Sequence, residues 1–146
     1  MSVPEQAPVG TVVTHRRYVS YAEAHYAGDL VDGAWGLGLF GDVATEMCIL
    51  TDGDEGLFAS YAEVQFRAPV RAGDVVEASA TLTRLGTRSR ELAFALHVVA
   101  RRVGGTESGS AILAEPVLAT TAVGTVVVPA TRPVQTRPGV STPTRR

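Results

Sequence analysis

The feature that most constrains the fold is one long apolar segment, residues 34–50, which is followed by strand-like sequence alone. Its apolar side chains fall on every face of a helix: Trp35, Leu37, Leu39, Phe40, Val43, Met47 and Ile49. Such a helix is predicted to be buried on all sides. Asp32 or Gly33 is a suitable N-cap, and Gly53 and Gly56 are expected to end the helix.

Strand sequence flanks this helix on both sides. Residues 12–26 mix aromatic and β-branched residues with polar ones, which predicts a first strand. Four β-rich runs follow the helix: LFASYAEVQFRAPV, VVEASATLTRL, RELAFALHVVARRV and ILAEPVLATTAVGTVVV. Because short loops separate successive runs, we expect antiparallel neighbours. The order β-α-β-β-β-β predicts an α+β fold, in which an antiparallel sheet wraps around one long central helix.

Length and composition indicate one folded domain with loosely held ends. The 146 residues are 45% hydrophobic and carry a net charge of −2, which favours neither disorder nor nucleic-acid binding. We expect a flexible N-terminus at 1–11, a domain at 12–129 and a disordered Pro/Thr/Arg-rich tail at 130–146. The chain has no signal-like segment and no long apolar run, and its single cysteine suits a reducing compartment. These features predict a cytoplasmic protein without a membrane span.

Several reaction classes are excluded by residue content. All 13 basic residues are arginine, so no lysine is available for a Schiff base or a Walker motif. His15, His25 and His97 lack ligand-like spacing, and we expect no metal site. The segment 36–41, GLGLFG, matches a dinucleotide fingerprint, but no clear strand precedes it and it reads as helix interior. Cys48 has no His or Asp arrangement beside it and is expected to be a small buried hydrophobe.

Three segments together resemble a known family. They are HYAGDLVDGA at 25–34, GLFGDVATEMC at 38–48 and DGDEGLFASYAEVQF at 52–66. They are similar to hotdog-fold β-aminoacyl-CoA ammonia-lyases of the 3-aminobutyryl-CoA and β-alanyl-CoA type, and to relatives that add glycine to enoyl thioesters. The resemblance implies a lyase that reversibly adds or eliminates ammonia or glycine at the β-carbon of an α,β-unsaturated acyl thioester.

The same resemblance implies a substrate and an assembly. The thioester would be held by CoA or by an acyl-carrier protein, whose phosphopantetheine belongs to the substrate, and no separate cofactor is expected. The family works as homodimers with the active sites between subunits, and a trimer of dimers is a further possibility. A bulky apolar helix and an unpaired sheet edge make dimerisation physically reasonable.

Amine addition or elimination at that carbon needs a base for the α-proton and donors for the thioester oxygen. Asp42 and Glu46 lie one helical turn apart on one face, and Glu63 lies in a strand run. These three carboxylates are the candidates for the general base, and the sequence does not choose between them. His25 and Tyr26 precede the helix and are candidates to orient or protonate the amine.

The candidate substrate-binding residues are of two kinds. Some are expected near the helix, and the others are arginines whose positive charge suits a phosphate. Backbone N–H groups at the helix start would face the thioester oxygen, glycine permits close approach, and Tyr61 would share a face with Glu63 by strand alternation. Arginines suit phosphate or an acidic carrier surface. The set comprises Gly33, Ala34, Trp35, Gly41, Tyr61 and Arg88, with Arg67, Arg71 and Arg90 as further arginines.

Simpler structural roles are open for each candidate. Asp42 and Glu46 could be exposed acids paired with arginines, and Glu63 an outward strand residue. His25 and Tyr26 could be a hydrogen-bonded pair at a strand end, and His97 is expected to be structural. The alternative functions are a thioesterase, whose carboxylates would activate water, and a catalytically silent module that binds acyl thioesters.

Overall fold

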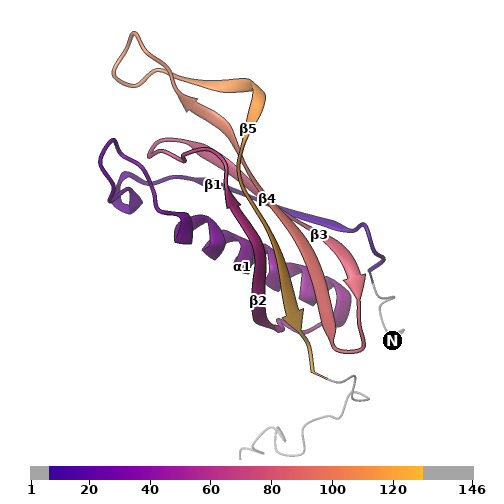
Figure 1. The fold of residues 1–146 in the computed structure, drawn as a ribbon. Coiled ribbons are helices and arrows are strands. Elements are labelled where there is room, and N and C mark those ends of the chain that lie inside the picture. The colour runs from indigo at the N-terminus through magenta and orange to yellow at the C-terminus, as the bar shows by residue number, and fades with distance from the viewer. Residues whose placement is uncertain (1–6, 130–146) are drawn as a thin grey trace, which may run out of the picture.

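The computed structural model describes residues 7–129, which form a curved five-stranded antiparallel sheet around one helix (Figure 1). The elements are β1 (Val12–Tyr18), a short 3-10 turn η1 (Tyr21–Glu23), α1 (Gly33–Asp52), β2 (Leu57–Phe66), β3 (Val75–Leu85), β4 (Ser89–Arg102) and β5 (Ser110–Val127). This order confirms the predicted hotdog-type architecture. The predicted tail at 130–146, and all but residues 7–11 of the predicted flexible N-terminus, lie outside the described residues.

The strands lie in the order β1-β3-β4-β5-β2, with every neighbouring pair antiparallel. Short connections make β3, β4 and β5 direct neighbours, as expected. The expectation was wrong for β2 and β3, because β2 pairs with β5 at the opposite edge of the sheet. The connection at 67–74 returns the chain from that edge to β3, so it crosses the end of the sheet instead of forming a hairpin.

The first strand is shorter than the sequence predicted. It ends at Tyr18, because Ser20 caps the 3-10 turn that follows and its side-chain oxygen accepts a hydrogen bond from the Ala22 N–H at 3.2 Å. A serine that satisfies a free backbone donor in this way ends strand structure locally. Residues 24–32 then lead to α1 as an irregular loop.

Capping residues set both ends of α1. The Asp32 carboxylate accepts a hydrogen bond from the Trp35 N–H at 2.9 Å, which makes Asp32 the N-cap. Gly53 ends the helix in the left-handed conformation, with φ at 64°. Gly36, Gly38 and Gly41 all lie within this helix, so GLGLFG is helix interior, as expected.

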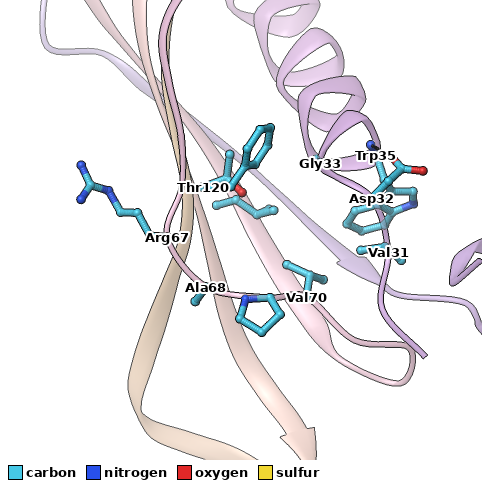
Figure 2. A pocket seen from close by; sticks show the side chains of 12 residues that line it. Val31, Asp32, Gly33, Trp35, Arg67, Ala68, Val70 and Thr120 are labelled. Atoms are coloured by element: carbon cyan, nitrogen blue, oxygen red, sulfur yellow. Dashed lines mark hydrogen bonds between the residues drawn. The ribbon is translucent and has the colours of Figure 1, made fainter. Parts of the chain in front are cut away.

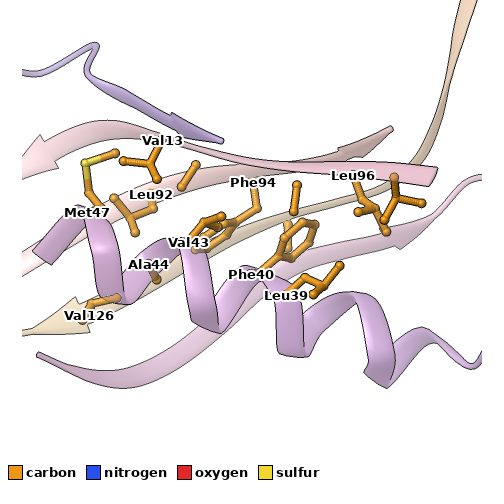
Figure 3. Close-up of a cluster of buried hydrophobic side chains, with 14 of the residues drawn as sticks. Val13, Leu39, Phe40, Val43, Ala44, Met47, Leu92, Phe94, Leu96 and Val126 are labelled. Atoms are coloured by element: carbon orange, nitrogen blue, oxygen red, sulfur yellow. The ribbon is translucent and has the colours of Figure 1, made fainter. Parts of the chain in front are cut away.

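Only one face of α1 is buried (Figure 3). That face packs onto the concave side of the sheet and includes Phe40, whose ring stacks on Phe94 of β4 at 4.9 Å between centroids. The opposite face, with Asp42, Glu46 and Ile49, is exposed. The prediction of burial on all sides was therefore wrong for this chain by itself, because a single sheet covers a helix from one side only. Among the described residues, no helix has the length and apolar character needed to cross a lipid bilayer.

Candidate active site

A cavity of about 260 Å³ opens at the N-terminal end of α1 (Figure 2). Its walls come from three parts of the fold: the start of α1, the chain that follows β2, and the middle of β4 and β5. The lining residues include Gly33, Trp35, Gly36, Phe66, Ala68, Pro69, Val70, Leu96 and Thr120. Two of the predicted substrate-binding residues, Gly33 and Trp35, therefore line this cavity.

Two glycines let the cavity walls approach the helix closely. A Cβ atom at Gly33 would lie 2.4 Å from Cε1 of Phe66, and one at Gly36 would lie 3.1 Å from Cδ2 of Leu96. Glycine at position 33 thus allows the Phe66 ring to lie across the first turn. The prediction of close approach does not extend to Gly41, where an added Cβ would meet nothing within 4 Å.

A histidine–aspartate pair stands at the rim of the cavity. Nε2 of His25 lies 2.5 Å from Oδ2 of Asp32, and the other carboxylate oxygen, Oδ1, caps the helix at Trp35. The hydrogen bond from His25, followed by that from the Trp35 N–H, holds the pKa of Asp32 below its ordinary value. The His25 ring also packs against the Tyr26 ring, with centroids 4.4 Å apart. The predicted pair His25–Tyr26 therefore lies beside the helix start, and Asp32 is a partner that the sequence analysis treated only as a cap.

Backbone hydrogen bonds fix the loop that carries His25. The Tyr26 N–H donates to the Leu30 carbonyl at 3.1 Å, and the Val31 N–H donates to the Val70 carbonyl at 3.1 Å. The Ala72 N–H donates to the Asp29 carbonyl at 2.8 Å. The chain before α1 is thus tied to the chain after β2, and both segments border the cavity.

A largely buried ion pair, Asp74–Arg101, fixes the position of the segment 67–74 that follows β2. The Asp74 carboxylate is 1% exposed and accepts hydrogen bonds from Nε and Nη2 of Arg101 at 3.0 and 2.8 Å. It also accepts one from the Arg71 N–H at 2.8 Å, while Arg101 donates to the Pro69 carbonyl at 3.0 Å. This pair raises the pKa of Arg101, chiefly through the hydrogen bonds that its guanidinium donates to Asp74. Neither residue was predicted, although the two of them position one wall of the cavity.

The two helix carboxylates lie away from this cavity. Asp42 and Glu46 are exposed on the outer face of α1 and do not line it. Oε1 of Glu46 lies 3.3 Å from Nε2 of His15 on β1, so its partner is a histidine where the structural alternative expected an arginine. Nδ1 of His15 is buried without a hydrogen-bond partner in the described chain.

Glu63 and Tyr61 do not share a face, contrary to the strand alternation that the sequence analysis assumed. Two register shifts in β2 leave its inward side chains three residues apart, at Phe58, Tyr61 and Val64. Glu63 lies in the second shift with φ at 53° and is exposed. A non-glycine residue in this left-handed region is uncommon. The alternation therefore fails because a β-bulge inserts an extra residue.

Tyr61 joins the sheet to the helix and does not line the cavity. Its hydroxyl donates a hydrogen bond to the Leu37 carbonyl of α1 at 2.6 Å, and its ring packs on Phe58 with centroids 4.2 Å apart. Burial raises the pKa of Tyr61 to about 12. The contacts of this side chain are those of a core residue.

The arginines are spread along the molecule. Arg67 borders the cavity, but its guanidinium points away from α1 (Figure 2) and donates to Thr121 at 3.3 Å. Arg71 is exposed. Arg90 is buried and forms a bidentate pair with Asp52 at the C-terminal end of α1, roughly 30 Å from the cavity for a helix of this length. Arg88 is two residues from Arg90 and donates to the Val128 carbonyl, so it too lies at the far end.

Several functional candidates could not be found from the sequence. Nothing in the pattern links Phe66, Leu96 and Thr120, which come from three strands and meet only in the folded sheet. Asp32 carried a signal, since it follows His25 by seven residues across a glycine-containing loop. Within residues 7–129, no three His, Cys, Asp or Glu side chains are grouped as metal ligands.

Comparison with known proteins places the chain in a family. A profile of the thioesterase superfamily matches residues 33–105. A 3-aminobutyryl-CoA ammonia lyase of Acetoanaerobium sticklandii is 48% identical over 112 residues, which cover 76% of this chain and 89% of that protein. The structure of β-alanyl-CoA:ammonia lyase from Clostridium propionicum superposes with a TM-score of 0.79 at 34% identity, covering 84% of this chain and 87% of that one.

More distant structures share the fold alone. A hexameric hotdog-fold thioesterase of Campylobacter jejuni gives a TM-score of 0.65 at 15% identity, covering 77% of this chain and 79% of that chain. The hotdog fold and the superfamily profile define the class of protein. The chain belongs to the thioesterase superfamily, and within it to the family of the 3-aminobutyryl-CoA and β-alanyl-CoA ammonia lyases.

Proposed function

We propose that this protein is a carbon–nitrogen lyase that reversibly adds or eliminates an amine at the β-carbon of an acyl-CoA thioester. The observation that carries this proposal is the 48% identity to a 3-aminobutyryl-CoA ammonia lyase over 76% of the chain. The cavity at the start of α1 is consistent with it, because it is partly apolar and has a histidine–aspartate pair at its rim. Such a site suits an acyl chain that bears one amine.

The reaction passes through an enolate-like state at the thioester carbonyl. In the elimination direction a base removes the α-proton, the Cβ–N bond breaks, and the electrons of the C–H bond form the new double bond. N–H groups in the first turn of α1, where the helix dipole is positive, would stabilise charge on the thioester oxygen. The thioester therefore activates its own α-carbon, and the protein has to supply the base, the donors and a place for the amine.

We propose that Asp42, Glu46 and Glu63 remain the candidates for the base, in an active site completed by a second copy of the chain.

β2 is the last strand in the sheet order, so one edge of its backbone has no strand beside it among residues 7–129. Leu57 and Phe66 at its two ends are 72% and 60% exposed. Apolar side chains along an open edge favour pairing with another strand. A homodimer joined at β2, alone or in a trimer of dimers, would cover this surface.

The donor, the carrier and the compartment complete the proposal. The amine is ammonia or glycine, and the acyl group is held by CoA or by a carrier protein. The protein needs no cofactor of its own, because phosphopantetheine arrives with the substrate. We propose a cytoplasmic location, since the single cysteine, Cys48, can form no internal disulfide and is buried.

The test is mass spectrometry of crotonyl-CoA incubated with the protein and with ammonia or glycine, followed by a crotonyl-carrier protein. A mass gain equal to the donor with the thioester intact supports the proposal and identifies the donor. Free acid and thiol with no adduct would make the protein a thioesterase. Tight binding of acyl-CoA without turnover would leave only the silent binding module.

The base can be assigned with three variants and one control. Asp42→Asn, Glu46→Gln and Glu63→Gln each remove a carboxylate with little change of shape, and Glu55→Gln does the same at an exposed loop position. Loss of the true base should lower kcat about 100-fold or more, while the control keeps the wild-type rate. Full activity in all three variants would exclude the carboxylate mechanism.

A further inference from the structure

The two oxygens of the Asp32 carboxylate have different partners, and both partners are hydrogen-bond donors. Oδ1 accepts from the Trp35 N–H at 2.9 Å, and Oδ2 contacts Nε2 of His25 at 2.5 Å. Among the common N-cap side chains, only the aspartate carboxylate has two oxygens that can each accept a hydrogen bond from a different donor. Serine has one oxygen, and asparagine has an amide N–H₂ on its second branch. Capping is equally compatible with serine, asparagine or aspartate, and among these only aspartate also offers a second acceptor oxygen to His25.

This arrangement sets the position of the proton on His25. An ionised carboxylate has no proton to donate, so Nε2 of His25 must carry the hydrogen of this short contact. In the neutral ring Nδ1 is then the basic nitrogen, and it has no hydrogen-bond partner within residues 7–129. The His25 side chain is 58% exposed, so the imidazole is open to small molecules from solvent.

The surroundings of the pair hold it in one geometry. Backbone bonds at Tyr26, Val31 and Ala72 fix the loop on which His25 lies, and Asp32 is fixed by its place at the helix start. Asp32 lines the cavity, and its contact with Nε2 of His25 places the histidine directly beside that lining. The ring is therefore constrained by the bonded loop that carries it and by its contact with Asp32.

We propose that Asp32 is a positioning residue, which holds His25 as the Nε2–H tautomer so that Nδ1 takes a proton from the ammonium form of the donor. This inference rests on the proposed function. The amine loses one proton to Nδ1, its lone pair forms the Cβ–N bond, and the π electrons move to the thioester carbonyl. The α-carbon then takes up one proton, which the imidazolium supplies directly or through a carboxylate. The proton count is thereby restored.

Asp32→Asn tests the tautomer without removing the cap. Asparagine caps helices as well as aspartate does, so the thermal midpoint should change little. With its oxygen on the Trp35 N–H, the amide presents N–H₂ to His25, which forces Nε2 to accept and moves the proton to Nδ1. Nitrogen-15 spectra of histidine-labelled protein, with His25→Gln to assign the signal, should report Nε2–H in the wild type and Nδ1–H in the variant. An Nδ1–H ring in the wild type would overturn the proposal.

Kinetics separate positioning from a structural role. We expect His25→Gln to lower kcat for amine addition about 100-fold and Asp32→Asn at least tenfold, with little change in KM for the thioester. The double variant should be no slower than His25→Gln alone, because Asp32 acts through His25. Asp29→Asn, on the same loop and with φ at 57°, is the matched control and should keep the wild-type rate.

The outcomes distinguish this proposal from the function on which it depends. If the wild type adds amines and Asp32→Asn does so equally well, the lyase function stands and the positioning role is refuted. Independent, multiplicative losses in the double variant would refute it as well. If the wild type adds no amine, the proposed function fails, and the nitrogen-15 spectra still decide the tautomer. Should Asp32→Asn not fold, Asp32→Ser keeps a capping oxygen, loses the contact with His25 and should show a tenfold loss.

Discussion

Replacing Asp74 by alanine should destabilise the protein far more than replacing an acid in a surface pair. The change removes three hydrogen bonds to a carboxylate, two from Arg101 and one from the Arg71 N–H. Removing one partner of a buried pair costs about 3–5 kcal/mol. Because the Arg101 side chain keeps 22% exposure to water, we expect the lower end, about 3 kcal/mol.

The matched control is an arginine–carboxylate pair at the protein surface. Glu77 of β3 accepts hydrogen bonds from Nε and Nη2 of Arg16 at 3.2 and 3.0 Å, but the Arg16 side chain is 65% exposed and that of Glu77 is 35% exposed. Glu77→Ala should therefore cost less than about 0.5 kcal/mol. Both variants remove an arginine–carboxylate pair and differ chiefly in burial, while Asp74→Ala also removes the bond from the Arg71 N–H.

Urea unfolding followed by circular dichroism measures both changes. Asp74→Ala should lower the urea midpoint with an unchanged m value, and its thermal midpoint should fall by about 12 °C. Because the turn that Asp74 holds also borders the cavity, amine addition should slow in the same variant. A loss of less than about 1 kcal/mol, or a loss equal to that of Glu77→Ala, would refute the reasoning from burial.

Three further predictions concern single residues. The hydrogen bond from His25 depresses the pKa of Asp32, so the stability that this contact contributes is complete above pH 4 and is lost as the pH falls through the folded pKa. Between pH 2.5 and 5 the free energy of unfolding should therefore rise with pH, and Asp32→Asn should reduce that rise. Burial raises the pKa of Cys48 to about 11, so a thiol reagent at about pH 8 should label it only after denaturation. Gly124→Ala should cost about 2 kcal/mol in urea unfolding, because its Cβ would lie 2.6 Å from the rings of Phe58 and Phe94.

The sequence predicted the elements of the fold because they follow from periodicity and turn residues. The apolar segment became α1 between Asp32 and Gly53, and four strand runs became β2 to β5. The pairing of β2 with β5 could not be predicted in this way, since it depends on where the chain returns after the helix. The exposure of the outer face of α1 could not be predicted either, because an apolar sequence does not indicate how many sides of a helix the rest of the fold covers.

The sequence indicated which residues lie near the cavity where they are neighbours along the chain, but not where their positions depend on a bulge or on long-range contacts. His25, Tyr26, Gly33 and Trp35 lie close together in the sequence, and the structure keeps them together at the start of α1. Period-two alternation misplaced Tyr61, because a bulge adds a residue to the strand and reverses which side chains face inward. Gly33 and Trp35 line the cavity and Tyr61 does not, while the functional roles of all three stay predictions.

The central claim is that this protein makes and breaks a carbon–nitrogen bond while the thioester stays intact. The most direct test is to incubate 3-aminobutyryl-CoA with the protein and to quantify ammonia, crotonyl-CoA and free thiol in the same sample. The account predicts equal amounts of ammonia and crotonyl-CoA, with thiol at the level of a sample without protein. Release of thiol and free 3-aminobutyrate without ammonia would contradict it.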